Sequence, residues 1–470
     1  MSFPAYPAYR DSGVEWLGAI PEHWGVKQLR YLGRFRKGLT ITKADLADTG
    51  IPCLNYGEVH SLYPFEVNQD IQPLKCVPPE YLETDPSACV KSGDFVFADT
   101  SEDLEGVGNF THVSGMEPLF AGYHTIIYSL DSEVSSRFLA YCLESFAFRT
   151  QLRLGVKGVK VFSVTQEILR GGTAWLPTTA EQTKIARFLD HETARIDALI
   201  EEQQRLIELL KEKRQAMISH AVTKGLDPTV PMKDSGVEWL GEVPAHWDVK
   251  ALRRVLKESL SNGVFKKKED FGRGVLLVNV FDVYRPNFQV NYSSLDRVDC
   301  NAAEISSYSV LPGDLFFVRS SLKYEGIAVV AVAGECSEPV VYECHLICAR
   351  PDPAVFNGRY GSYLFNSSNY RAAMISKSKL TTMTTIDQEA ISSTLIPTPP
   401  LSEQAEISVF LDREINKVDQ LIGEAYSVCE LLKERRSALI SAAVTGKIDI
   451  RGWQQPTSAQ APELEVAEAV

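Results

Sequence analysis

The sequence predicts an α+β protein in which two tandem β-rich domains are separated by two long helices that form an antiparallel coiled coil. Three observations indicate this class: an internal duplication, two helical segments with a heptad pattern, and strand-like segments between them. Each half of the chain would contribute one domain and one helix. We therefore expect an internal repeat with a pseudo-twofold axis.

The two long helices are indicated by apolar residues that alternate in steps of four and three. In residues 181–219 these positions are Ile185, Leu189, Ile196, Leu199, Leu206 and Leu210. Adding 222 to each number gives the second set, Ile407, Leu411, Val418, Leu421, Val428 and Leu432. Such spacing is typical of the contact seam of a coiled coil. Gly225 and Gly446 are placed to end the two helices.

The duplication extends to the start of each domain. DSGVEWLGAIPEHWGVKQLR at 11–30 recurs at 234–253, with 15 of 20 positions identical. The shared residues include Trp16, Pro21, His23 and Trp24, which match Trp239, Pro244, His246 and Trp247. Two tryptophans with a proline between them favour an aromatic clamp that seats each domain, and a docking surface for a partner is the alternative.

These features divide the chain into five segments. We expect a first β-rich domain at 1–178, a first helix at 179–226, a second domain at 227–397, a second helix at 398–450 and a disordered acidic tail at 451–470. The ends of a compact domain usually lie close together. The second helix should therefore return along the first, in antiparallel orientation. Pairing of each helix with a separate chain is the alternative.

The charge pattern indicates a local rather than a general affinity for nucleic acid. A net charge of −13 argues against a protein that simply coats nucleic acid. Basic residues nevertheless gather at 27–43, 149–170, 250–273 and 371–386, which are equivalent places in the two halves. This distribution is typical of an electrostatic footprint, whereas isolated charged segments usually only solvate a surface.

Other sequence features exclude several classes of protein. The chain lacks an apolar run of about 18 residues and a secretory leader, and its nine cysteines form no CxxC pair, so we expect a cytoplasmic protein. Cys336, Cys344, His345 and Cys348 lie close together, but an apolar strand explains them better than zinc. His124 and His345 are equivalent and are predicted to be core histidines. No phosphate-binding loop or methyltransferase tetrapeptide is present.

The doubled DSGVEWLGxxPxHW motif and the helix entries TAEQTKIARFLD and LSEQAEISVFLD resemble the specificity subunits of Type I restriction–modification systems. The resemblance covers all but the C-terminal tail. It implies two target-recognition domains that read the halves of an interrupted double-stranded DNA sequence. It also implies helices that set the spacer and dock two modification subunits, which methylate adenine.

The resemblance further implies that catalysis lies outside this chain. S-adenosylmethionine would be used by the modification subunits, and ATP and Mg by restriction subunits that translocate and cleave DNA. The chain itself would bind no cofactor and no metal. The alternatives are a coiled-coil scaffold that reads no DNA and a self-sufficient fused enzyme, and the missing methyltransferase tetrapeptide argues against the enzyme.

Three loops in each domain correspond to the DNA-contacting loops that the resemblance implies. The candidates are Arg36, Lys37, Thr40, Lys43, Lys157 and Lys160 in the first domain, and Lys266, Lys267, Lys268, Arg273, Arg319, Ser320, Lys323, Lys377, Lys379 and Thr382 in the second. The middle loop of the first domain is acidic. Its Asp99 and Glu102 either accept hydrogen bonds from cytosine amino groups or do not touch DNA.

Overall fold

The computed structural model describes residues 3–131, 133–158, 160–380 and 383–456. The chain forms two compact units. Unit 1 comprises Met1–Gln203 and Val428–Val470, and unit 2 comprises Gln204–Ser427. Each unit therefore contains one β-rich domain, the beginning of one long helix and the end of the other. Across the described ranges, no helix has both the length and the apolar character needed to span a membrane.

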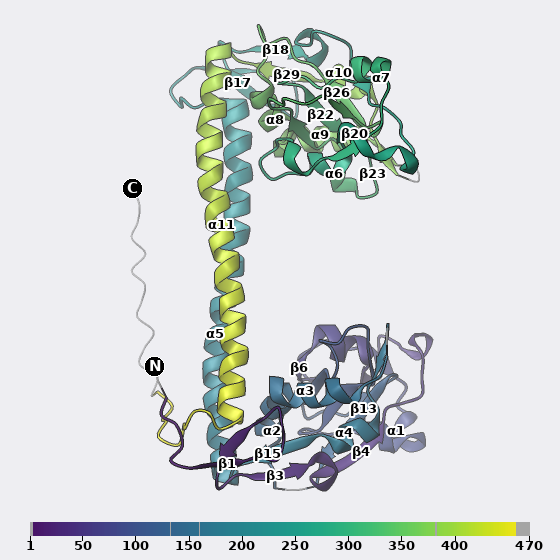
Figure 1. Ribbon diagram of the computed structural model, residues 1–470, viewed down its shortest axis with the longest axis vertical. Helices are drawn as coiled ribbons and strands as arrows, with labels where there is room; N and C mark the ends of the chain where they lie inside the picture. Colours follow the sequence, from purple (N-terminus) through teal and green to yellow (C-terminus); the bar gives the residue numbers. More distant parts are fainter. Residues whose placement is uncertain (1–2, 132, 159, 381–382, 457–470) are drawn as a thin grey trace. The chain divides into compact units, whose positions relative to one another are not determined.

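The domain of unit 1 is built around a five-stranded sheet and a four-stranded sheet (Figure 1). In spatial order, the larger sheet consists of β4 (Gly33–Lys37), β13 (Thr125–Leu130), β9 (Phe95–Ala98), β11 (Phe110–Val113) and β6 (Phe65–Val67). The smaller sheet consists of β7 (Cys76–Val77), β5 (Ile51–Leu54), β12 (Leu119–Ala121) and β8 (Cys89–Val90). Three ribbons complete the domain: β1 (Tyr9–Asp11) with β2 (Ala19–Pro21), β3 (Gly25–Gln28) with β15 (Thr173–Leu176), and β10 (Thr100–Ser101) with β14 (Phe162–Ser163).

The central strands are apolar on both faces because two different cores cover them. On β9, Phe95 and Phe97 belong to the core shared with the helices, whereas Val96 and Ala98 belong to a core shared with the smaller sheet. This alternation follows from the two-residue period of a strand. The helices that accompany the sheets are α1 (Tyr81–Thr84), α2 (Ser136–Glu144), α3 (Phe146–Gly155) and α4 (Gln166–Gly171).

The domain of unit 2 repeats this plan with one strand fewer in each of the two equivalent sheets. Its main sheet consists of β19 (Ser261–Asn262), β26 (Leu346–Ala349), β22 (Leu315–Val318) and β24 (Val330–Val332). A second sheet consists of β21 (Asp296–Val298), β20 (Phe271–Val278) and β25 (Val340–Tyr342). A third sheet consists of β23 (Ser320–Ser321), β28 (Thr384–Thr385) and β27 (Lys379–Leu380). The ribbons are β16 (Met232–Asp234) with β17 (Glu242–Pro244), and β18 (Asp248–Ala251) with β29 (Leu395–Thr398). The short helices are α6 (Val280–Val283), α7 (Ala302–Ser307), α8 (Gly358–Phe365), α9 (Ser368–Ser376) and α10 (Gln388–Ser392).

In each domain, a helical region is divided into two short helices. Helices α2 and α3 meet at Ser145, which has an extended backbone (ψ 146°) and whose hydroxyl accepts a hydrogen bond from Phe148 N (3.3 Å). Serine favours the start of a helix because its side chain satisfies a free backbone N–H. In unit 2, α8 and α9 are separated at Asn366 and Ser367. The break redirects each second helix across the domain.

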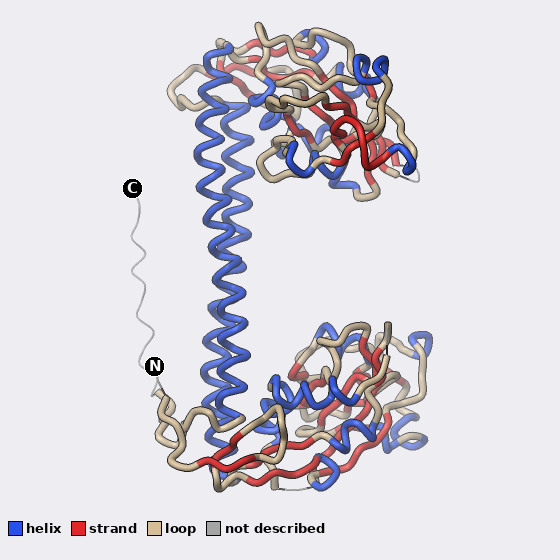
Figure 2. The backbone as a smooth tube through the Cα atoms, in the orientation of Figure 1, coloured by secondary structure: helices blue, strands red, loops and turns tan. Residues whose placement is uncertain are grey.

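The long helices α5 (Thr179–Lys224) and α11 (Leu401–Val444) lie side by side within each unit (Figure 2). In unit 1, Ile185 near the beginning of α5 shares a core with Val444 at the end of α11. Further along α5, Asp197 Oδ1 accepts a hydrogen bond from Arg436 Nε (2.8 Å). The two segments therefore run antiparallel, as predicted.

The same direction holds in unit 2. Val222, near the end of α5, shares a core with Ile407, near the beginning of α11. About two turns earlier on α5, Arg214 Nε donates a hydrogen bond to Asp419 Oδ1 (2.9 Å). Each unit thus pairs the beginning of one long helix with the end of the other.

The buried face of the two helices follows an eleven-residue spacing rather than the expected heptad. Every eleventh residue is no more than 7% exposed along both helices: Ile185, Ile196, Ile207 and Ile218 on α5, and Ile407, Val418, Cys429 and Ile440 on α11. Leu189 and Leu411 are fully buried beside this face, and Leu210 and Leu432 are half-buried. An eleven-residue repeat averages 3.67 residues per turn, close to the 3.6 of a straight α-helix.

Four positions of the heptad seam therefore differ from the prediction. Leu199, Leu206, Leu421 and Val428 are 40–49% exposed. A heptad stripe drifts by about 20° per repeat around a straight helix. In the middle of each long helix this drift has carried the heptad positions off the contact face.

Both long helices end on a glycine with a left-handed backbone. Gly225 has φ +79° and Gly446 has φ +68°, conformations that are unfavourable for other residues. A Cβ atom at Gly446 would collide with the ring of Pro21, and a Cβ atom at Gly225 would lie 3.3 Å from the indole of Trp247. Each duplicated tryptophan motif therefore packs on the end of the helix that arrives from the other half of the sequence.

Candidate nucleic-acid interface

A buried glutamate at the start of α5 holds the tryptophan motif of unit 1. Glu181 Oε1 accepts hydrogen bonds from Tyr6 Oη (2.6 Å) and Trp24 Nε1 (3.3 Å), and Glu181 Oε2 lies 2.9 Å from His23 Nε2. Burial and the neighbouring Glu181 carboxylate raise the pKa of Tyr6. Trp24 is 1% exposed, so this contact satisfies a buried donor.

The equivalent glutamate of α11 makes the same contacts in unit 2. Glu403 Oε2 accepts a hydrogen bond from Trp247 Nε1 (3.0 Å) and lies 2.9 Å from His246 Nε2. The repeated geometry confirms the structural role predicted for Trp24 and Trp247 and fixes each domain to the beginning of its long helix.

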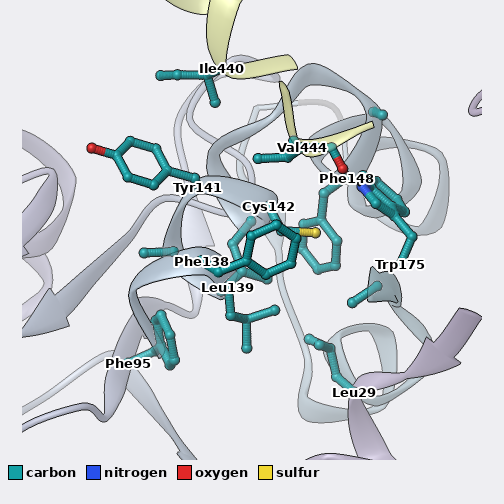
Figure 3. Close-up of a cluster of buried hydrophobic side chains, with 14 of the residues drawn as sticks. Leu29, Phe95, Phe138, Leu139, Tyr141, Cys142, Phe148, Trp175, Ile440 and Val444 are labelled. Atoms are coloured by element: carbon teal, nitrogen blue, oxygen red, sulfur yellow. Dashed lines mark hydrogen bonds between the residues drawn. The ribbon is translucent and has the colours of Figure 1, made fainter. Parts of the chain in front are cut away.

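The end of α11 is built into the core of unit 1 (Figure 3). Ile440 and Val444 pack with Phe138, Cys142 and other side chains of α2 and α3. The buried indole of Trp175 donates a hydrogen bond to the carbonyl oxygen of Val444, one of the last carbonyls of the helix. The loops of the domain are thereby carried on a scaffold that includes both helices.

Four chain segments meet at the end of β9: the three predicted loops of the first domain and the turn before β13. Asp99 follows β9, and its N–H donates to the carbonyl oxygen of His124 (3.1 Å) at the turn before β13. The N–H of Val164, from the third loop, donates to the carbonyl oxygen of Asp99 (2.7 Å). The first loop also approaches the turn, because a Cβ atom at Gly38 would collide with the carbonyl oxygen of Gly122.

These segments surround a depression of about 1090 Å³. Its lining comprises Arg30, residues 37–41, Asp99, residues 122–126, residues 163–167, Arg170 and Gly171. The basic side chains of Arg30, Lys37 and Arg170 are exposed at its edge. The arrangement offers cations suited to phosphate oxygens and polar groups suited to base edges.

The same junction exists in unit 2. Arg319 follows β22, and its N–H donates to the carbonyl oxygen of His345 (2.9 Å) before β26. The N–H of Ile386, from the third loop, donates to the carbonyl oxygen of Arg319 (3.0 Å). A Cβ atom at Gly263 would collide with the carbonyl oxygen of Glu343, so the first loop again packs closely against the turn before β26. The duplication has therefore preserved the junction as well as the fold.

The structure corrects the prediction that His124 and His345 are core residues. The side chain of His124 is 62% exposed, its backbone has φ 55°, and its Nδ1 lies 3.2 Å from Asp99 Oδ1. His345 is also exposed, with Nδ1 2.7 Å from Ser320 Oγ. Both histidines directly precede the apolar strand that made them resemble core residues. Because each lies in the turn, its ring faces solvent.

The exposed candidates of the first domain lie in three environments. Lys37 and Thr40 are exposed and line the depression at the end of β9. Lys157 lines a neighbouring depression of about 890 Å³ that also contains Trp16. Lys43 and Lys160 are exposed elsewhere on the loops.

Arg36 is held inside the first domain. Its guanidinium donates to the carbonyl oxygens of Ser87 (2.6 Å) and Cys89 (2.9 Å), to Asp94 Oδ2 (3.1 Å) and to Ser129 Oγ (2.8 Å). The bond to Cys89 connects β4 of the larger sheet to β8 of the smaller sheet, and the four hydrogen bonds together give the side chain a structural role.

The candidates of the second domain are mostly exposed. Exposed side chains are those of Lys267, Lys268, Arg273, Arg319, Lys323, Lys377 and Lys379. Lys266 is only 12% exposed and its Nζ lies 2.8 Å from Glu304 Oε2, a hydrogen bond that raises the pKa of Lys266. Ser320 is buried against His345. Thr382 lies outside the described residues.

The structure adds basic residues that the loop-based prediction omitted. Arg30 and Arg170 lie in the basic segments 27–43 and 149–170 but outside the three chosen loops. Arg30 recurs as Arg253, so the duplication was a usable signal for it. Within the described ranges, no group of three or more His, Cys, Asp or Glu residues is arranged to hold a metal ion.

The sequence is similar to that of known proteins over most of its length. Residues 245–424 match the family model of the Type I restriction modification DNA specificity domain. The chain is 23% identical over 419 residues to the Type I restriction enzyme EcoKI specificity subunit of Escherichia coli K12, covering 87% of this chain and 84% of that protein. It is 22% identical over 421 residues to the StySPI specificity subunit of Salmonella potsdam, with the same coverage.

Solved structures share the fold. A chain from a study of complex assembly and conformational transition of the type I R-M system aligns with a TM-score of 0.67 at 17% identity, covering 90% of this chain and 98% of that chain. The crystal structure of the HsdS subunit from Thermoanaerobacter tengcongensis aligns with a TM-score of 0.51 at 17% identity, covering 91% and 98%.

Proposed function

Because the chain belongs to the specificity subunits of Type I restriction–modification systems, we propose that its two β-rich domains each read one half of an interrupted double-stranded DNA sequence. The chain acts in the cytoplasm as a non-catalytic subunit and binds no cofactor itself. Adenine methylation with S-adenosylmethionine and cleavage that uses ATP and Mg belong to partner subunits.

The observation that carries this proposal is the duplicated junction at Asp99 and Arg319. In each domain, three loops converge at the end of one central strand, and each loop is held by backbone hydrogen bonds. Exposed lysines and arginines lie on the loops that form both junctions. Two similar surfaces on one chain suit a target with two halves, because phosphate contacts position a protein and base contacts specify the sequence.

The long helices supply the second part of the proposal. We infer that α5 and α11 set the spacer between the half-sites and provide the docking surface for two modification subunits, and that restriction subunits join this complex. Exposed apolar side chains on both helices support a docking role, since Leu199, Leu206, Leu421 and Val428 lie off the buried face.

The decisive experiment is to co-express the chain with the modification subunit of its own system in a host that lacks adenine methylation, and then to sequence the genome for methylated adenines. One bipartite motif with a fixed gap is the expected result. A purified complex that methylates no site would contradict the proposal that the chain recognises a DNA target with two halves. A continuous motif without a gap would contradict the use of two domains.

A coiled-coil scaffold that reads no DNA is distinguished by a binding measurement on the complex. Lys267 and Lys379 are exposed in the first and third loops of the second domain, and Lys379 Nζ lies 3.4 Å from Asp387 Oδ2 at the surface. We expect the double substitution of both lysines by glutamine to weaken DNA binding. If both lysines contact phosphates, the magnitude of the slope of log affinity against log salt concentration should also decrease by about 1.8.

The control for this measurement is Lys91→Gln, an exposed lysine in the turn before β9. The control should leave both affinity and salt slope unchanged. Equal binding by the double variant and the wild type would contradict a role for these loops in DNA contact.

A further inference from the structure

One position of the duplicated junction carries opposite chemistry in the two domains. Asp99 and Arg319 are equivalent by backbone contacts, because each donates its N–H to the carbonyl oxygen of a turn histidine and accepts a hydrogen bond from the third loop. The strand pairs before them are also equivalent, with Ala98 opposite Thr125 and Val318 opposite Leu346. A carboxylate in one domain thus occupies the place of a guanidinium in the other.

The backbone of this position is fixed in the same way on its far side. The two residues after Asp99, Thr100 and Ser101, pair with Ser163 and Phe162 of the third loop. In unit 2, Ser320 and Ser321 pair with Thr385 and Thr384. A residue held between a central strand and a short ribbon presents its side chain in a defined direction, which is the preorganisation that base reading needs.

In domain one, the neighbouring histidine orients the carboxylate. His124 Nδ1 lies 3.2 Å from Asp99 Oδ1, and the Asp99 side chain is 33% exposed. Within the described part of the chain, Asp99 Oδ2 has no hydrogen-bond partner. The carboxylate can therefore accept a hydrogen bond from a group that enters the depression lined by Lys37, Arg30 and Arg170.

In domain two, the equivalent histidine leaves the cation free. His345 Nδ1 lies 2.7 Å from Ser320 Oγ. Arg319 is exposed, and among the residues that the structure describes its guanidinium makes no hydrogen bond and no ion pair. An arginine in this state presents a planar set of donors to solvent.

We propose that Asp99 and Arg319 are specificity-determining residues that each read one base in their own half-site. Asp99 accepts a hydrogen bond from an exocyclic amino group in the major groove, which cytosine N4 or adenine N6 supplies. Arg319 donates two hydrogen bonds to O6 and N7 of guanine. His124 is a positioning residue that holds the Asp99 carboxylate. This inference rests on the proposed reading of DNA by both domains.

The test uses the full chain, co-expressed with its modification subunit, and compares the methylated motifs of single variants by genome sequencing. Asp99→Asn replaces an acceptor oxygen by a donor of the same shape, and Arg319→Gln removes the paired donors. The controls are Asp48→Asn, an 85% exposed carboxylate outside the depression, and Arg297→Gln, a 43% exposed arginine on β21.

We expect Asp99→Asn to relax or change one base position in one half-site, and Arg319→Gln to relax one guanine position in the other half-site. Discrimination at the affected position should fall by about 5- to 150-fold, the range for a lost base contact. The wild-type motif identifies the amino group as that of cytosine or adenine. His124→Phe should relax the same position as Asp99→Asn, whereas both controls keep the wild-type motif.

An unchanged motif in both Asp99→Asn and Arg319→Gln, with normal methylation, would overturn this inference and leave the proposed function intact. Uniform loss of methylation at all sites by an assembled variant complex would also overturn it, because the residue would then act on stability or phosphate contact. Failure of the proposed function is recognised separately, since the wild-type chain would then produce no bipartite motif.

Discussion

The side chain of Glu403 connects the tryptophan motif of the second domain to the beginning of α11. Glu403→Ala would leave the indole N–H of Trp247, a fully buried side chain, without its acceptor. We expect a loss of about 1–3 kcal/mol in the free energy of unfolding, seen as a lower Tm in thermal unfolding. The control Glu406→Ala, on an exposed position one turn later, should change stability by no more than about 0.5 kcal/mol. Equal effects of the two substitutions would show that the hydrogen bond contributes little.

His112 should make the first domain sensitive to acid. Burial, followed by the positive charge of Arg137, lowers the pKa of His112 to about 4, whereas the unfolded chain has a value near 6.5. Between these values the unfolded chain binds a proton that the folded chain does not, so stability falls as the pH drops from about 6.5 toward 4. The contribution from pH 7 to pH 5 is about 2 kcal/mol.

The measurement is thermal unfolding of wild type and His112→Gln at pH 7 and pH 5. Glutamine retains a polar group near Ser136 Oγ, which lies 3.1 Å from His112 Nε2, but does not titrate. The variant should therefore lose less stability on acidification than the wild type. An identical pH dependence of the two proteins would exclude His112 as its source.

At the scale of the helices, neighbouring residues on α5 separate the eleven-residue face from the heptad seam. Ile207 is 4% exposed and Leu206 is 43% exposed. Ile207→Ala removes buried methyl groups and should destabilise the protein by about 2–4 kcal/mol, whereas Leu206→Ala should cost less than about 1 kcal/mol. Thermal unfolding of the two variants measures the difference. A larger loss for Leu206→Ala would support the heptad seam.

At the scale of the whole molecule, the proposed spacer role predicts a dependence on helix length. Matched deletions of residues 197–203 and 419–425 shorten each helix by about 10.5 Å, which corresponds to about three base pairs of DNA. We expect the methylated motif to keep both half-sites and to have a shorter gap. Genome sequencing of the co-expressed variant complex reads the gap directly. An unchanged gap in an active variant would contradict the spacer role.

The sequence by itself determined the repeat, the two long helices, the β-rich character of the domains and the resemblance to a family. These features are local or come from direct comparison of the two halves, so they need no knowledge of packing. The glycine stops at Gly225 and Gly446 belong to this group, because a helix end requires a left-handed residue in either half. The basic loop segments were also visible as charge patterns.

Only the tertiary structure decided which side of each pattern is buried. Leu206 and Ile207 have similar hydrophobicity, and only the packed structure shows that Ile207 is buried and Leu206 is exposed. His124 borders an apolar strand in the sequence, yet the turn before β13 exposes its ring. Arg36 lies in a basic segment, yet the strands around it hold its guanidinium inside the domain. Whether a side chain is buried depends on the segments, distant in the sequence, that pack against it. The periodicity of a local sequence does not reveal which segments these are.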